Sequence, residues 1–130
     1  MIAVDTNVLV RVLVDDPGHT AQARLARARV KRAGKVYVPQ IVQVETVWVL
    51  ETAYGMAKRD IVDILDHLLQ NSAYILQNEH SFQQALTSYR DGPADFADYL
   101  VVAESRVANA GLITFDKNLG RNTDVTLLKA

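Results

Sequence analysis

The sequence predicts an α/β protein in which a parallel sheet is covered by helices on both faces. Five short apolar segments that suit strands alternate with six longer segments that suit helices. This alternation is typical of parallel sheets buried on both sides. Two of the helical segments, 40–54 and 58–71, are joined only by Gly55-Met56-Ala57, which predicts an antiparallel hairpin.

The element boundaries follow from turn residues and from apolar spacing. Gly34, Gly55 and Gly111 each follow a helical segment, where glycine commonly ends a helix. Turns are expected at 15–18 and 91–93, which contain Asp, Pro and Gly. Strands are predicted at 2–4, 35–38, 73–76, 112–115 and 125–128. Helices are predicted at 7–14, 19–33, 40–54, 58–71, 79–89 and 95–110.

Length and composition limit the kind of protein and the kind of site. The chain has 130 residues, enough for one domain with a real core, and 49% of them are hydrophobic. Its formal net charge of -1 gives no global signal for nucleic acid or membrane. Because cysteine is absent, a metal site would have to use carboxylates or the three scattered histidines, His19, His67 and His80.

The chain shows no targeting or membrane segment. Asp5 lies too close to the start for a signal peptide, and Arg11 interrupts the apolar run that follows. No run approaches the roughly 20 apolar residues that span a bilayer. We therefore expect a cytoplasmic protein that does not associate with membranes.

The first strand runs directly into Asp5-Thr6-Asn7. Open α/β sheets place their ligands at the carboxyl ends of the strands, so Asp5 would face a ligand site if its strand is central. The alternative is that these polar residues cap the helix that follows.

A carboxylate in the third helical segment stands among apolar residues. Glu45 has Ile41, Val42, Trp48 and Val49 at helical spacing, so it points along a face that we expect to be buried. A buried lone carboxylate is costly unless something such as a cation compensates its charge. The alternative is an exposed interface with Glu45 at its rim.

Two further carboxylates fit the same pattern. Asp98 precedes Val101 and Val102 on an apolar helix face, with Asp95 at the expected N-cap. Asp116 follows the strand 112–115 as Asp5 follows the first strand, although it would also suit an ordinary turn. Apolar neighbours at helical spacing also surround Glu104 and flank Glu51 on one side. This criterion therefore does not choose among the candidate acids.

The acids, taken in order, resemble those of a known family. Asp5-Thr6-Asn7, Glu45, Asp98 within 95–100 and Thr114-Phe115-Asp116 are similar to the acidic motifs of the PIN domain. The length and element order resemble the VapC-type toxins of type II toxin–antitoxin pairs. The resemblance covers the whole chain as a single domain. It implies a three-layer α/β/α sandwich with a central, mostly parallel sheet of about five strands.

The resemblance implies a ribonuclease that depends on Mg²⁺ or Mn²⁺. Asp5, Glu45, Asp98 and Asp116 would be the acidic quartet, and Thr6, Asn7 and Thr114 would support it. Asp95 could share the metal, whereas Glu104 and Glu51 match no acidic position of the family. Tyr99 departs from the pattern, because a small residue often follows the third acid.

Carboxylate oxygens are the ligands that hard divalent cations prefer, and such cations lower the pKa of a bound water. We therefore expect in-line hydrolysis of an RNA phosphodiester by metal-activated water. Leaving out the four acids moves the formal charge from -1 to +3 (-1 plus 4). Arg11, Lys117 and Arg121 are predicted to contact RNA phosphates, with solvated surface charges as the alternative.

The helical segments 40–54 and 58–71 carry more apolar residues than a small domain buries, which predicts a groove or a dimer face. The resemblance implies a homodimer and an antitoxin that lays a helix there. Two other functions stay open. One is a PIN-like module that binds RNA or protein without cutting, and the other is a Mg²⁺-dependent phosphoesterase with Asp5 as nucleophile.

Overall fold

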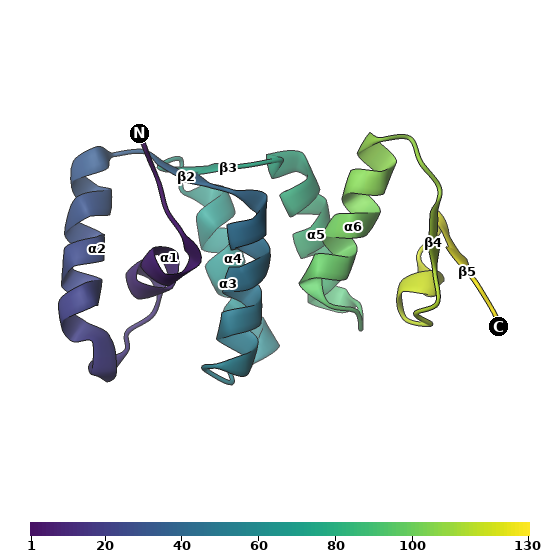
Figure 1. The fold of residues 1–130 in the computed structure, drawn as a ribbon, viewed down its shortest axis with the longest axis horizontal. Helices are drawn as coiled ribbons and strands as arrows, with labels where there is room; N and C mark the ends of the chain where they lie inside the picture. Colours follow the sequence, from purple (N-terminus) through teal and green to yellow (C-terminus); the bar gives the residue numbers. More distant parts are fainter. The chain divides into compact units, whose positions relative to one another are not determined.

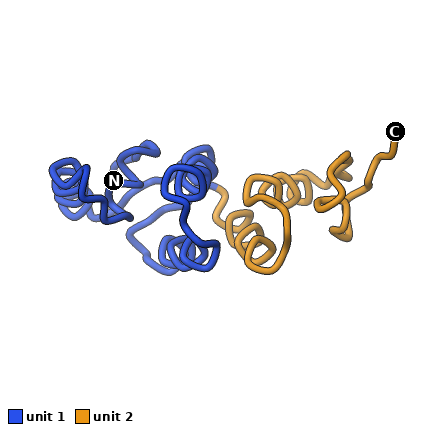
Figure 2. Tube along the Cα trace, turned by 90° about the horizontal axis from the view of Figure 1, so that it is seen from below, with its two compact units in different colours: residues 1–77 blue, residues 78–130 orange.

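The computed structural model describes all 130 residues, with six α-helices, five strands and two short 3₁₀ turns (Figure 1). Every predicted strand and helix is present, with ends that differ by at most three residues. The chain divides into two compact units, residues 1–77 and residues 78–130 (Figure 2). None of the helices has the length and apolar character to span a bilayer.

The first unit contains a parallel sheet of three strands in the order β1-β2-β3. The strands are β1 (Ile2–Ala3), β2 (Val36–Val38) and β3 (Tyr74–Leu76). Ile2 pairs with Val36 and Val38 pairs with Leu76, and the pairing is parallel throughout. Within this sheet β2 is central and fully buried at Val36 and Val38. The first strand is therefore an edge strand of this sheet, not its centre.

Four helices complete the first unit: α1 (Thr6–Leu13), α2 (Thr20–Ala33), α3 (Gln40–Thr52) and α4 (Lys58–Gln70). The 3₁₀ turn η1 (Pro17–His19) connects α1 to α2, as the turn residues predict. In Figure 1, α3 leaves the end of β2 and α4 returns to the start of β3, which confirms the predicted hairpin. The largest fully buried apolar side chains of this unit are Leu9, Leu50, Ile61, Leu65 and Leu68.

The second unit contains the helices α5 (Glu79–Asp91) and α6 (Phe96–Val107), followed by β4 (Leu112–Thr114), the 3₁₀ turn η2 (Leu119–Arg121) and β5 (Val125–Leu127). The two helices pack closely around aromatic rings. Phe96 contacts Phe82 and Tyr89 edge to face, with ring centroids 5.6 and 5.8 Å apart. Strands β4 and β5 pair in parallel. The chain thus has the predicted α/β class, with its five parallel strands divided three and two.

Candidate functional site

Asp5 lies between β1 and α1, and it caps the helix. Its backbone is extended (φ -88°, ψ 179°), and its Oδ1 accepts a hydrogen bond of 3.0 Å from the Val8 N–H. The capping interpretation is therefore correct. Capping uses one carboxylate oxygen, and the side chain stays exposed, so the other oxygen is available to a cation. Thr6 and Asn7 form the first turn of α1 beside it.

Glu45 is exposed on α3, so the prediction that it faces the core was wrong. Ile41 and Trp48 on the same stripe are 69% and 63% exposed. The reason is that α3 carries apolar residues around most of its circumference, so apolar neighbours did not identify its buried face. That face is formed by Val42, Gln43, Thr46, Val47 and Leu50. The alternative of an exposed stripe around Glu45 is the correct one.

Sequence reasoning missed Gln43, which orients the start of α3. Its side chain is 1% exposed. Its Nε2 donates to the carbonyl oxygen of Val38 (3.2 Å), the last paired residue of β2, and to that of Gln77 (2.9 Å), which follows the last paired residue of β3. Gln43 thereby ties the helix that carries Glu45 to the carboxyl end of the sheet. The available signal was a polar residue in phase with Val47 and Leu50.

Three acids of the second unit interact. Asp98 lies in the first turn of α6 and is half-buried. Burial raises the pKa of its carboxyl group, and the carboxylates of Asp95 and Asp116 raise this pKa further. A hydrogen bond from the Asp95 backbone N–H acts in the opposite direction. Asp95 is the N-cap residue, but its side chain makes no capping bond.

Asp116 follows β4 and folds the chain into a turn. Its Oδ1 accepts from the N–H groups of Asn118 (2.7 Å) and Leu119 (3.1 Å). Thr114 Oγ1 accepts from the Asp116 N–H at 3.0 Å, so this threonine holds the backbone of the acid. The turn interpretation is correct, and it commits one oxygen of an exposed side chain.

Two residues that the family pattern left aside have structural partners. Glu104 accepts hydrogen bonds from Ser81 Oγ and Asn78 Nδ2, and so links α6 to the start of α5. Tyr99 is buried, and its hydroxyl accepts a bond of 3.1 Å from the Ala94 N–H. The bulky residue after Asp98 therefore fixes the turn between α5 and α6.

The predicted RNA-binding cations have different settings. Arg11 is half-buried, and it donates to Gln22 Oε1 (2.9 Å) and to the Tyr54 hydroxyl (3.1 Å). Part of its guanidinium is thus used within the fold. Lys117 and Arg121 are exposed and line a hollow of the second unit together with Phe115 and Lys129.

Carboxylate oxygens fit the hard-cation chemistry expected here, since Asp5 and Asp116 each keep one oxygen outside the capping bonds. Neither unit holds a group of three or more acids or histidines arranged to bind a metal ion. Asp5 and Glu45 belong to the first unit, and Asp98 and Asp116 to the second. The convergence of the four stays a prediction.

These features define a class: an α/β protein whose parallel strands β1 and β4 each lead into an acidic turn. The PIN domain profile matches residues 2–124, and the chain therefore belongs to the PIN domain family. PIN domains are in general nucleases. No curated protein sequence matches the chain.

Proposed function

We propose that this PIN domain is an endoribonuclease that requires Mg²⁺ or Mn²⁺ and acts as the VapC-type toxin of a type II toxin–antitoxin pair. The observation that carries the proposal is the setting of Asp98, a half-buried carboxyl group whose pKa is raised first by burial and then by the carboxylates of Asp95 and Asp116. Crowded carboxylates with raised pKa values are typical of sites that a cation neutralises. The match to a nuclease family supports the same chemistry.

Asp5, Glu45, Asp98 and Asp116 would hold the metal, which when bound supplies an activated water and offsets charge on the phosphate. The chain's own contribution is positioning. Val8 fixes the Asp5 carboxylate, and Asn118 and Leu119 fix that of Asp116. Thr6, Asn7 and Thr114 support these acids, and Asp95 is a further ligand candidate. All four acids would act within a single domain.

The test is cleavage of a labelled RNA with Mg²⁺, Mn²⁺ or EDTA. Asp5→Asn, Glu45→Gln, Asp98→Asn and Asp116→Asn should each lower the rate by more than the ~10–100-fold typical of residues behind a metal ligand. Asp63→Asn, which removes an exposed acid of α4, is the control and should keep the rate. Metal-independent cleavage, or loss of activity in the control alone, would contradict the proposal.

Metal binding can also be measured without turnover. A cation that binds only the folded chain stabilises it by about 2.7 kcal/mol at 100 times its Kd. Mg²⁺ or Mn²⁺ should therefore raise the Tm of the wild type, and less so that of Asp98→Asn. RNA binding without cleavage and without this shift would favour the non-catalytic module instead.

Lys117 and Arg121 are proposed to bind phosphates beside Asp116, because they are exposed and line one hollow. Charge reversal at both residues should weaken RNA binding and flatten its dependence on salt. An unchanged slope would remove them from the interface. Arg11 is proposed as a third contact through the donors that Gln22 and Tyr54 leave free.

The exposed apolar side chains Ile41 and Trp48 on α3 support a partner surface. We propose that this surface serves homodimerisation and antitoxin binding in the cytoplasm. Trp48→Glu should shift the chain to a monomer in light scattering. A wild type that is already monomeric at high concentration would contradict the dimer.

A further inference from the structure

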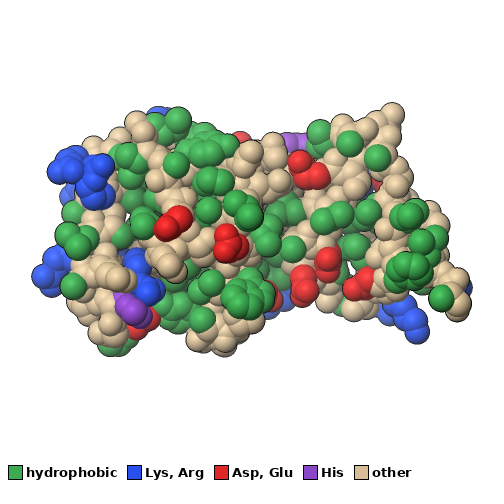
Figure 3. Space-filling model, in the orientation of Figure 1, with side chains coloured by type: hydrophobic (Ala, Val, Ile, Leu, Met, Phe, Trp, Pro, Cys, Tyr) green, Lys and Arg blue, Asp and Glu red, His purple; other side chains and the backbone are tan.

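The helix α2 concentrates positive charge. It carries Arg24, Arg27, Arg29, Lys31 and Arg32, and no acidic residue. The chain has a formal charge of -1, so the rest of it carries -6 (-1 less +5). Lys and Arg side chains gather over this helix in Figure 3. A protein without a global positive charge thus has a local one.

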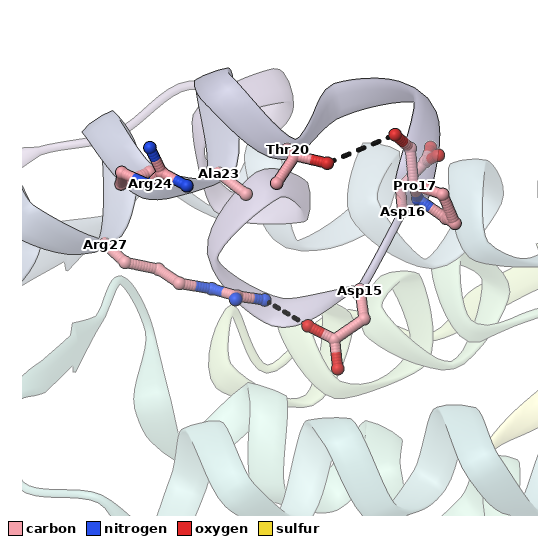
Figure 4. Close-up of a pocket in the computed structure, with 7 residues that line it drawn as sticks. All are labelled: Asp15, Asp16, Pro17, Thr20, Ala23, Arg24 and Arg27. Carbon is pink, nitrogen blue, oxygen red and sulfur yellow. Dashed lines mark hydrogen bonds and ion pairs between the residues drawn. The ribbon is translucent and has the colours of Figure 1, made fainter.

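One of these five cations has a structural role. Arg27 donates to Asp15 Oδ1 (2.9 Å) and to the carbonyl oxygen of Val12 (3.2 Å) near the end of α1. Figure 4 shows this ion pair in the hollow at the turn between the helices, where Arg24 also lies without a bond. Arg24, Arg29, Lys31 and Arg32 are exposed and make no ion pair.

A groove of about 380 Å³ lies between α1 and α2. Its α2 wall includes Gln22, Leu25 and Arg29, which follow one another at steps of three and four residues and so share one helix face. Arg32, three residues further, continues that face. The α1 wall includes Asp5, the first acid of the proposed nuclease site. Two free arginines therefore lie on the helix face that borders Asp5's groove.

We propose that this face of α2 is a track for single-stranded RNA, on which Arg29 and Arg32 contact phosphates near the bond to be cut. The inference rests on the proposed nuclease function and names a substrate-binding element for it. From Gln22 to Arg32 the helix rises about 15 Å. Gln22, Leu25, Arg29 and Arg32 therefore form a stripe long enough to follow a short stretch of extended strand.

Charge and apolar content favour RNA over an acidic protein helix. A helix docked in a groove needs apolar anchors at several successive turns. This groove offers only two exposed large apolar side chains, Leu25 at 71% and Val8 at 37%. Phosphates instead need what α2 supplies, which is unpaired guanidinium groups and no carboxylate of its own.

The experiment is RNA binding by fluorescence anisotropy across a range of KCl concentrations, in EDTA so that binding is separated from metal-dependent cleavage. The variant Arg29→Gln/Arg32→Gln is compared with Arg24→Gln/Lys31→Gln, which removes the same charge from another face of the same helix. Glutamine keeps the helix propensity of arginine, and circular dichroism checks the fold.

The groove-face variant should bind RNA at least ~10-fold more weakly, and its log–log salt slope should flatten by about 1.4, or 0.7 for each lost contact. The control should show less than half of each change. Equal changes in both variants would reduce the effect to net charge and overturn the track. An unchanged groove-face variant would overturn it as well.

A synthetic amphipathic helix with leucines on one face and glutamates on the other serves as the competing probe. If the groove-face variant loses this peptide but keeps RNA, the groove is a protein-docking site and the RNA track is overturned. If α2 binds RNA as expected but the wild type never cleaves with metal, the nuclease function fails while the track stands. The two failures are therefore distinguishable.

Discussion

The backbone N–H of Asp95 donates a hydrogen bond to the carboxylate of Asp98, whereas the Asp95 carboxylate repels the same group. Burial, Asp95 and Asp116 outweigh the hydrogen bond, and the pKa of Asp98 is raised above 3.8. A carboxyl group whose pKa is raised on folding binds its proton better in the folded state. Ionised Asp98 therefore destabilises the folded chain.

Asp98→Asn should accordingly raise the Tm at neutral pH in the absence of metal, while it lowers cleavage. The difference in Tm should shrink as the pH falls through the pKa of Asp98 in the folded state. At that pH Asp98 of the wild type is protonated as well, so its charge no longer destabilises the fold. Thermal melts of both proteins across the acidic range check this. A lower Tm for Asp98→Asn at neutral pH would contradict it.

The contribution of Asp16 to stability should have the opposite pH dependence. The Tyr54 hydroxyl donates to Asp16 Oδ2 at 2.8 Å, and this bond is the largest cause of the lowered pKa of Asp16. A carboxyl group whose pKa is lowered on folding stabilises the fold at pH values above its ordinary pKa of 3.8. This stabilisation is lost as the pH falls through the pKa of the folded state. Tyr54→Phe should lower the Tm at neutral pH, with a smaller difference well below 3.8. A difference that is constant with pH would assign the effect to packing or to the lost bond from Arg11.

Gln43→Ala should cost stability because the Val38 and Gln77 carbonyl oxygens lose their side-chain donor. The Val38 carbonyl oxygen keeps the Gln77 N–H at 3.0 Å, so the loss falls mainly on the Gln77 carbonyl oxygen. A lost hydrogen bond of this kind costs about 1 kcal/mol, and the emptied space adds to this. Urea denaturation gives the free energy of unfolding. Gln70→Ala, at the exposed end of α4, is the matched control and should stay within about 0.5 kcal/mol of the wild type. Equal losses of unfolding free energy in the two variants would show that the hydrogen bonds of Gln43 do not stabilise the fold.

Gly92→Ala should destabilise the turn between α5 and α6. A Cβ at this position would lie 2.8 Å from the Ser88 carbonyl oxygen and closer still to the Tyr99 hydroxyl. Overpacking of this kind costs typically 1–3 kcal/mol. Gly111→Ala is the control, because a Cβ there meets nothing within 4 Å. If both variants melt like the wild type, the contact with Tyr99 does not constrain the turn.

The features that could be predicted from the sequence are those set by residues close together in the chain, such as helix caps and turns. Gly34 is the C-cap of α2 with a positive φ of 76°, as its position indicated. Gly55 also has a positive φ, 56°, but it lies three residues after the end of α3. Gly111 does not end α6, because the positive φ after that helix belongs to Asn109. Asp5 and Asp116 make the capping and turn bonds that were their alternative interpretations, both with residues two or three positions away. Such bonds depend on neighbours along the chain, so spacing reveals them.

Long-range pairings were not predictable in this way. Arg11 bonds Tyr54, and Gln43 bonds Gln77, across 43 and 34 positions, and no local pattern specifies such partners. The prediction for Glu45 failed for a related reason, because the buried face of α3 is set by the helices it packs against, α1 and α4, rather than by its own apolar residues. The central place of β2 likewise depends on which strands pair.

Trp48 is the only tryptophan of the chain, and it stands on the exposed stripe of α3. Its fluorescence emission therefore depends on the solvent around one face of α3 and only weakly on the packing of the core. A blue shift on addition of a second protein would mark coverage of that face directly, without any label. Trp48 is therefore an intrinsic fluorescent probe at the surface where the proposed partner would bind.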